Sequence, residues 1–175
     1  PAELKDELAK ITYSYGHVDL AVDAARNAFS SWRKVPLENR CALLRQYQSV
    51  LKRRAEEGAE LIARETGKPL WESKTEVSSM INKIDITLTD SLEAVRDRRI
   101  ENILPGTTGV WTHRPLGVCA VIGPFNFPGH LPNGHIVPAL MTGNTVVFKP
   151  SEKAPLVGQW MAECFQEAGF PAGVF

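Results

Sequence analysis

An asparagine in a proline-rich segment is the first residue whose type and setting suggest chemistry. Residues 123–140, GPFNFPGHLPNGHIVPAL, contain four prolines and three glycines, and Asn126 stands between two phenylalanines there. Prolines stiffen a backbone and remove amide donors, whereas glycines permit turns that other residues resist. A side-chain amide held still in a dry cleft is a good donor for a developing oxyanion. The residues leave a second interpretation open, in which Asn126 is a turn residue that bonds its own backbone.

A lysine and a glutamate follow a second apolar run and form another candidate site. Lys149 and Glu152 come directly after TVVF, residues 145–148. An acid at such a position can bond ribose hydroxyls, and a lysine can bond the same ribose or a phosphate. A solvated pair near a helix N-terminus, with Glu152 favoured by the helix dipole, explains the same residues equally well. No G-x-G-x-x-G stands between strand and helix, which excludes a conventional Rossmann fingerprint.

The histidines and cysteines predict neither a metal site nor a disulfide framework. His130 and His135 have no Cys, Asp or second His at ligand spacing, so we expect no bound metal. Cys41, Cys119 and Cys164 are far apart and odd in number, which argues against paired thiols. Each cysteine lies among apolar residues, and we expect all three to be buried core thiols in a reducing cytoplasm.

Charged, amphipathic helices are expected over the first half of the chain. Residues Asp19–Arg33 carry apolar side chains every four positions, with Asp19 as the expected N-cap. Pro36 should open a second helix, and Gly67, in TGKP, should end a third. Apolar residues at spacings of three and four mark a longer helix over Val77–Val95. Such helices are typical of a layer that packs around the outside of a core.

Strands and helices alternate in the second half of the chain. Val118–Ile122, VCAVI, is apolar without polar alternation, as in a strand covered on both faces. The strand TVVF follows, then a helix over Leu156–Ala168, and AGVF, residues 172–175, should begin another strand. Before them, GVWTHRPLG, residues 109–117, has the pattern of an extended segment. The order β, α, β, α, β implies a parallel, doubly wound sheet, with ligands beyond the carboxyl ends of its strands.

Composition places the chain among ordinary globular proteins. Hydrophobic residues make up 43% of its 175 residues and charged residues 23%, and Lys plus Arg and Asp plus Glu both total 20. A neutral chain gives no electrostatic argument for nucleic acid or for an anionic membrane surface. No apolar run approaches the roughly 20 residues that span a bilayer, and PAELKDELAK at the N-terminus carries no secretory signal. We therefore expect a cytoplasmic protein without membrane or nucleic-acid partners.

Several motifs, taken together, resemble one enzyme family. PFNFP, PAL and GNTVVFKPSE, with ARETGKP (Ala63–Pro69) and the downstream Glu76–Val77, resemble the N-terminal half of the NAD(P)-dependent aldehyde dehydrogenase superfamily. The resemblance covers almost the whole chain. It implies the N-terminal part of a doubly wound, Rossmann-like α/β sheet, preceded by a helical layer and truncated before the full cofactor and catalytic domains. The implied organisation is a helical part over 1–108, an oligomerisation-type extended segment over 109–117, and the first, incomplete βαβα units of the NAD-binding domain over 118–175.

This resemblance implies roles for particular positions. Asn126 matches the family's oxyanion-hole asparagine, and an acid at Glu152 favours NAD as cofactor because it would repel a 2′-phosphate. Leu131 and His135 are expected on the substrate side, although a partly buried helix position explains His135 as well. The residues expected to bind the cofactor are Ile122, Gly123, Pro124, Phe125, Lys149, Ser151 and Glu152.

Three longer segments narrow the resemblance to one branch of the family. ARETGKPLWESKTEV, MINKI and NFPGHLPNGHIVPAL are similar to enzymes whose aldehyde substrate carries carboxylates. A pocket for such a substrate should supply cationic or amide donors. His135 is the residue expected to do so if it faces the substrate.

The implied parent enzyme oxidises an aldehyde to an acid with NAD, through a cysteine thiolate and a general-base glutamate. In the family both residues, and a glycine-rich G-S-x-x-x-G turn, lie beyond the equivalent of Phe175, so we expect the chain to be inactive by itself. A coenzyme A-dependent acylating dehydrogenase, another aldehyde range, and a non-catalytic nucleotide-binding or scaffold module remain alternatives. The expected partners are a small-molecule aldehyde and, because a two-stranded ribbon needs support, further copies in a homo-oligomer.

Overall fold

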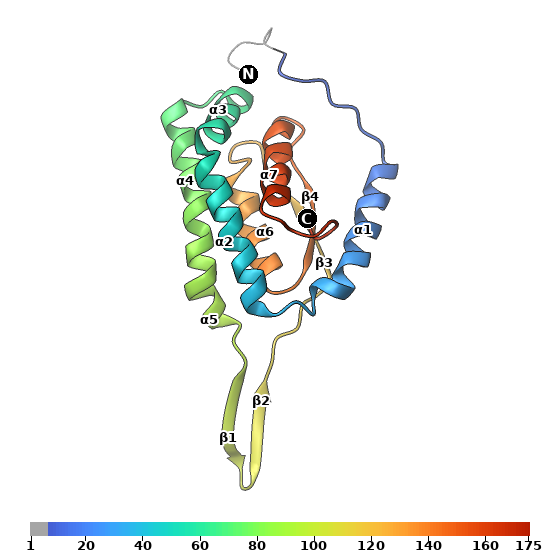
Figure 1. Cartoon of the computed structure of the whole chain (residues 1–175), viewed down its shortest axis with the longest axis vertical. Helices are drawn as coiled ribbons and strands as arrows, with labels where there is room; N and C mark the ends of the chain where they lie inside the picture. Colours follow the sequence, from blue (N-terminus) through green and yellow to red (C-terminus); the bar gives the residue numbers. More distant parts are fainter. Residues whose placement is uncertain (1–6) are drawn as a thin grey trace.

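The computed structural model describes residues 7–175; residues 1–6, part of the N-terminal stretch in which no secretory signal was found, lie outside the described residues. Figure 1 shows helices grouped around a small sheet, with a long hairpin projecting from one end. The elements in chain order are α1 (Gly16–Trp32), α2 (Leu37–Arg53), α3 (Ala55–Thr66), α4 (Leu70–Ile86), the π-helical turn η1 (Thr87–Ser91), α5 (Leu92–Ala94), β1 (Arg98–Leu104), β2 (Thr107–Trp111), β3 (Val118–Ile122), α6 (His130–Met141), β4 (Thr145–Lys149) and α7 (Pro155–Glu167).

The helix boundaries follow local signals in the sequence, with two corrections. The helix expected over Val77–Val95 begins earlier, at Leu70, and its last part is divided into η1 and α5. α3 ends at Gly67, which takes a left-handed conformation (φ 77°) and donates its N–H to the carbonyl of Ala63 at 2.8 Å, so the predicted C-cap is confirmed. α1 begins at Gly16, and Asp19, expected as the N-cap, lies inside the first turn instead. An acid there is still favoured by the positive end of the helix dipole. The acid therefore marks the start of the helix without capping it.

Two of the three expected strands pair in parallel, and the third does not form. β3 and β4 stay in register along their whole length, ending with Ile122 opposite Lys149. Residues 172–175 form a turn and not a strand. One backbone hydrogen bond, from Val146 N to Val174 O at 2.9 Å, joins them to β4. One such bond does not fix a strand, because pairing depends on successive bonds and cross-strand contacts. The described residues form a mixed α/β fold with two two-stranded sheets, and the expected larger sheet is not seen among them.

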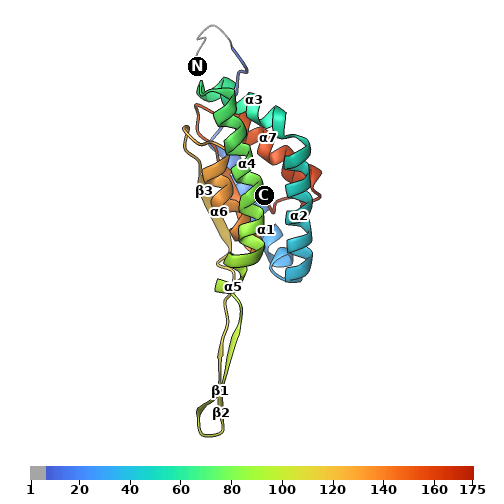
Figure 2. The same ribbon diagram turned by 90° about the vertical axis from the view of Figure 1, so that its left-hand side faces the viewer.

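The extended segment expected over 109–117 continues one arm of a hairpin. β2 pairs antiparallel with β1, which lies within the part of the chain, residues 1–108, that was expected to be helical. Every residue of β1 is exposed, so no buried face imposes the apolar alternation that marks a strand in sequence. Figures 1 and 2 show this hairpin projecting far from the other elements. Its exposed apolar side chains are Ile100, Ile103, Leu104, Val110 and Trp111.

One core joins the helices to the sheet. In Figure 1, β3 and β4 lie between α1 on one side and α6 on the other, with α2 and α4 beyond α6. Tyr47 of α2 stacks on Phe165 of α7, with ring centroids 3.8 Å apart. The Tyr47 hydroxyl donates to Oδ1 of Asn133 on α6 at 3.1 Å, and Nδ2 of Asn133 donates to the carbonyl of Met80 on α4 at 3.2 Å. These buried contacts hold α6 against α2 and α4.

Candidate functional site

The segments that follow β3 and β4 begin at the same edge of the sheet, as the sequence predicted. Ile122, the last residue of β3, lies opposite Lys149, the last residue of β4. The next N–H along, that of Gly123, donates to the carbonyl of Lys149 at 2.9 Å. The parallel register therefore brings the proline-rich turn and the Lys149–Glu152 segment to one place.

The turn after β3 presents Asn126 at the surface. Its side chain is exposed and makes no hydrogen bond within residues 7–175, so the bond to its own backbone expected of a simple turn residue is not made. Its backbone is held, because the carbonyl of Asn126 accepts a hydrogen bond from Lys68 Nζ at 2.8 Å. The dry cleft expected around this amide is not formed by the described residues. Asn126 thus combines a fixed backbone with an amide that is free to meet a ligand.

A buried ion pair that was not expected from the sequence anchors this turn. Lys68 Nζ lies 2.7 Å from Oε2 of Glu76, whose side chain is fully buried on α4. The other carboxylate oxygen, Oε1, accepts from the N–H groups of Gly129 and His130, at 2.9 and 3.1 Å, where α6 begins. The signal was present in the sequence as an acid on the apolar stripe of α4, beside Val77. Such a carboxylate needs buried partners, but the sequence does not say which ones.

A second buried carboxylate holds the start of α7. Oε1 and Oε2 of Glu65 accept from the N–H groups of Leu156 and Val157, at 2.9 and 2.8 Å. Burial raises the pKa of Glu65, and the two backbone hydrogen bonds offset part of that rise. Glu65 and Glu76 lie on either side of the TGKP turn, which connects α3 to α4. Glu76 therefore binds the start of α6, the helix after β3, and Glu65 binds the start of α7, the helix after β4.

The segment after β4 carries its charges at the surface. Lys149 Nζ lies 3.1 Å from Oε2 of Glu152, and both side chains are more than half exposed. The pKa of the Glu152 carboxyl is lowered by its own backbone N–H and then by Lys149. Ser151 between them is buried, and its Oγ accepts from the N–H of Lys153 at 3.2 Å. Lys153 Nζ lies 5.0 Å from the centre of the Phe125 ring, which links this segment to the turn after β3.

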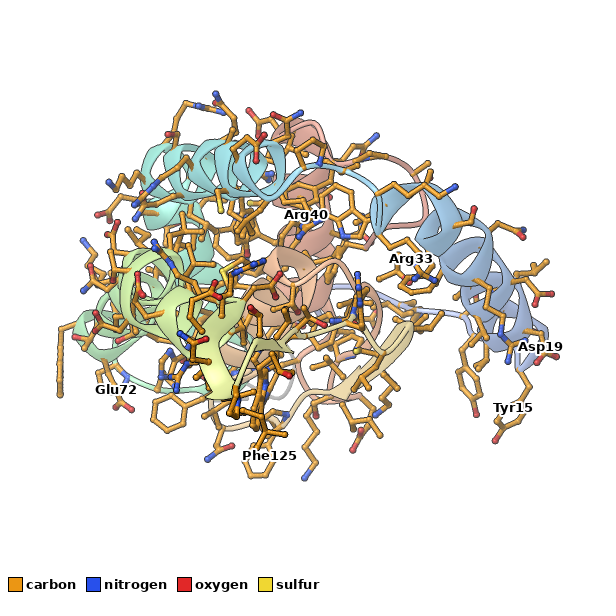
Figure 3. All side chains as sticks on the ribbon, turned by 90° about the horizontal axis from the view of Figure 1, so that it is seen from below. Tyr15, Asp19, Arg33, Arg40, Glu72 and Phe125 are labelled. Atoms are coloured by element: carbon orange, nitrogen blue, oxygen red, sulfur yellow. The ribbon has the colours of Figure 1, made fainter. Side chains whose placement is uncertain are left out.

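Two of the other expected cofactor residues, Ile122 and Phe125, form apolar surface beside these charges. Ile122 and Phe125 are exposed by 77% and 54%, whereas Gly123 is buried and Pro124 half-buried. Figure 3 shows Phe125 at the margin of the molecule, pointing away from the helices. This edge of the sheet therefore has exposed apolar side chains next to the exposed ammonium donor of Lys149 and the carboxylate acceptor of Glu152.

Leu131 and His135 lie four residues apart on one face of α6, and both are exposed. His135 is thus not the partly buried helix histidine of the alternative interpretation. A Cβ at Gly134 would meet nothing within 4 Å, so the surface beside them is open. The N–H of Leu131 donates to the carbonyl of Phe127 at 3.4 Å, which places this face next to the Asn126 turn.

None of the three cysteines is placed as a reactive thiolate. Cys164 is buried, and burial raises the pKa of its thiol to about 12. Cys41 and Cys119 are half-buried, where we expected fuller burial, and desolvation raises the pKa of both thiols. Each packs against the core from its margin, so neither is covered on every side.

Residues 7–175 contain neither a cluster of metal-ligating side chains nor a helix suited to cross a membrane. No group of three or more His, Cys, Asp or Glu side chains gathers as a metal ion would require. No helix in this part of the chain combines the length and the apolar character of a membrane span.

The motifs and fold identify a family. Residues 2–175 match the family model described as "Aldehyde dehydrogenase family". This chain therefore belongs to the aldehyde dehydrogenase family. It is 51% identical over 176 residues to an N-succinylglutamate 5-semialdehyde dehydrogenase 2 of Caulobacter vibrioides, covering 99% of this chain and 36% of that protein. It is 53% identical over 163 residues to an N-succinylglutamate 5-semialdehyde dehydrogenase of Ectopseudomonas mendocina, covering 92% and 33%.

Solved structures share the fold. A putative methylmalonate-semialdehyde dehydrogenase from Sinorhizobium meliloti 1021, complexed with NAD, superposes with a TM-score of 0.87 at 29% identity, covering 94% of this chain and 33% of that one. The chain spans about a third of the length of the curated relatives it matches.

Proposed function

We propose that the enzyme to which this chain belongs oxidises N-succinylglutamate 5-semialdehyde to N-succinylglutamate with NAD. The observation that carries the proposal is the identity of 51% and 53%, over nearly the whole chain, to two relatives with that activity in their names. The strand-end geometry supports it, because an unpaired amide and an exposed Lys–Glu pair start from one edge of the sheet.

The reaction builds negative charge on the aldehyde oxygen. When a thiolate attacks the carbonyl carbon, a C–S bond forms and the π electron pair moves to that oxygen. The Asn126 side-chain amide, free of partners in the described residues, is the donor we assign to it. Collapse of the oxyanion expels hydride from the carbon, and water then cleaves the thioester to the acid and the thiol. The thiolate belongs to another part of the enzyme, because the pKa of each thiol described here is raised.

Lys149 and Glu152 suit the ribose hydroxyls of NAD. The ammonium group donates and the carboxylate accepts, and both are open to a ligand. The lowered pKa keeps Glu152 ionised near neutral pH, where it would repel a 2′-phosphate, so we favour NAD over NADP. Ile122 and Phe125 would contribute apolar contact beside the ribose. NAD, when bound, supplies the hydride acceptor.

His135 and Leu131 are the residues we assign to the substrate side. The imidazole ring is exposed on the face of α6 next to the Asn126 turn, and it can donate to a carboxylate. Leu131 offers apolar contact from the same face, where it is 42% exposed. Gly134 leaves room beside both.

Assembly into a homo-oligomer is proposed from the hairpin. It exposes Ile100, Ile103, Leu104, Val110 and Trp111, and a hairpin with no covering layer is marginal in water. A second copy of the chain would cover these side chains. Light scattering of the complete enzyme should therefore give a mass above that of the monomer, and a monomer at micromolar concentration would contradict this.

The activity is tested with the complete purified enzyme, NAD and a panel of aldehydes, by the absorbance of NADH. We expect N-succinylglutamate 5-semialdehyde to give the highest kcat/KM without coenzyme A. A requirement for coenzyme A would favour the acylating alternative, and a better simple aldehyde would overturn the substrate assignment. NAD binding without turnover of any aldehyde would favour a non-catalytic nucleotide-binding module.

A further inference from the structure

The turn that carries Asn126 is bound to the helical layer through one side chain. Lys68 Nζ donates to the carbonyl of Asn126 at 2.8 Å and to Oε2 of Glu76 at 2.7 Å. It also lies 4.1 Å from the centre of the Phe127 ring. Only 10% of the lysine side chain is exposed. One ammonium group thus contacts α4, the backbone of the turn and an aromatic ring of the same turn.

Glu76 holds the end of this turn. Its Oε1 accepts from the N–H groups of Gly129 and His130, at 2.9 and 3.1 Å. The turn lies so close to α4 that a Cβ at Gly129 would come within 2.7 Å of Met80 Sδ. The ion pair therefore fixes the turn at its middle, through the lysine, and at its end, through the carboxylate.

Stability alone does not account for this pair. Well-packed apolar residues of similar volume often replace a buried ion pair without loss of stability. An apolar side chain at position 68, however, offers no bond to the carbonyl of residue 126. The side-chain amide of Asn126 has no hydrogen bond of its own within residues 7–175, so its direction depends on the backbone that Lys68 holds.

We infer that Lys68, anchored by Glu76, is a positioning residue that sets where the Asn126 amide points. The inference rests on the proposed function, in which Asn126 donates to the oxyanion. A catalytic group displaced by about 1 Å can lose about 10²-fold in rate. Lys68 acts only through Asn126 and touches neither substrate nor cofactor in this role.

A double-mutant cycle in the complete enzyme separates positioning from general support. Lys68→Met together with Glu76→Gln removes the ammonium contacts, leaves no unpaired buried charge and keeps a carbonyl oxygen for the α6 amides. Lys74→Met is the matched control, because Lys74 of α4 pairs with Glu56 at the same 2.7 Å but is 48% exposed. Each change is made with Asn126 intact and with Asn126→Ala. The measured quantities are kcat, KM for the aldehyde and KM for NAD.

With Asn126 intact, the Lys68→Met, Glu76→Gln variant should lose about 10- to 10²-fold in kcat, with both KM values within about twofold. In the Asn126→Ala background the same change should cost less than about twofold, because the residue through which it acts is gone. The control change at Lys74 should alter kcat in neither background. Equal losses in both backgrounds, or no loss with Asn126 intact, would overturn the inference.

Two further measurements decide the matter if that variant unfolds or if the enzyme oxidises no aldehyde. Lys68→Arg keeps the charge but replaces a compact ammonium with a planar fork, so it should give a smaller loss of kcat that again disappears with Asn126→Ala. Amide hydrogen exchange over residues 125–130 should accelerate in the Lys68 variants and stay unchanged in Lys74→Met. Absence of aldehyde turnover in the unaltered enzyme would refute the proposed function. Unchanged amide hydrogen exchange over residues 125–130 in the Lys68 variants would refute the inference that Lys68 fixes the turn.

Discussion

The two segments at the sheet edge each depend on a lysine–glutamate pair, but the pairs are used in opposite ways. Lys68 and Glu76 lie beneath the turn after β3, at 10% and 0% side-chain exposure. Lys149 and Glu152 belong to the segment after β4, at 59% and 75%. Charges removed from water need fixed partners, whereas exposed charges can exchange a partner for a ligand at little cost. The buried pair is therefore suited to fix the position of the turn, and the exposed pair is suited to bind a ligand.

The largest expected effect tests whether these two segments suffice for the reaction. The 175-residue polypeptide expressed alone should produce no NADH from aldehyde and NAD, although it contains both segments. Burial raises the pKa of the Cys164 thiol to about 12 and raises the pKa of the other two thiols, so none supplies a thiolate near neutral pH. Absorbance of NADH measures this, with the complete enzyme as the positive control. Turnover that disappears in Asn126→Ala would contradict the expectation.

Removal of the amide donor should have the next largest effect. In the complete enzyme, Asn126→Ala should lower kcat by about 10²- to 10³-fold, the scale for one oxyanion donor. KM for NAD should stay the same, because the exposed pair that we assign to the ribose is untouched. Steady-state kinetics measures both values. A loss below about tenfold would show that the turn after β3 does not serve catalysis through this side chain.

Stability should distinguish the two pairs directly. Glu76→Ala leaves the buried Lys68 ammonium with only the more distant, half-exposed Glu72 carboxylate at 4.0 Å and frees two amides of α6, so it should destabilise the fold by about 3 kcal/mol. Glu152→Ala alters a solvated pair and should leave the unfolding midpoint unchanged. Urea unfolding of the complete enzyme and both variants gives the comparison. Equal destabilisation by the two changes would remove the distinction between a structural and a surface pair.

Coenzyme preference should report on the exposed pair alone. Glu152→Gln removes the charge that would repel a 2′-phosphate while keeping an oxygen for a ribose hydroxyl. The ratio of kcat/KM with NADP to that with NAD should rise on the order of tenfold. Glu76→Gln is the control and should leave that ratio unchanged. If both changes move the ratio equally, the assignment of Glu152 to the ribose is wrong.

The smallest expected effect concerns the other buried carboxylate, which holds α7. Burial raises the pKa of Glu65 above its ordinary value, so the folded chain binds this proton more tightly than the unfolded chain. The stability that the carboxyl contributes is therefore complete below its unfolded pKa and is lost as pH rises through its folded pKa. Glu65→Gln cannot titrate, so its free energy of unfolding should fall less than that of the unaltered protein between about pH 4 and pH 7. Parallel pH profiles from urea unfolding would contradict this.

Local signals in the sequence determined much of the fold. Uninterrupted apolar runs at Val118–Ile122 and at residues 145–148 predicted two strands that pair in parallel. The expected cover on both faces of β3 was wrong, because Val121 is its one buried residue and Ile122 is exposed. Gly67 predicted the end of α3, because a left-handed C-cap suits glycine. The parallel order alone predicted that the segments with Asn126 and Lys149 would share an edge.

Only the tertiary structure decided what holds those residues. Glu76 meets the amide of Gly129 across 53 positions of sequence, and Lys68 meets the carbonyl of Asn126 across 58. β1 could not be read from sequence because it has no buried face, and residues 172–175 did not extend because one bond to β4 does not fix a strand. An acid on the apolar face of a predicted helix indicates a buried charge, which needs a partner. Which residue becomes that partner depends on how distant elements pack, and no local sequence pattern predicts this.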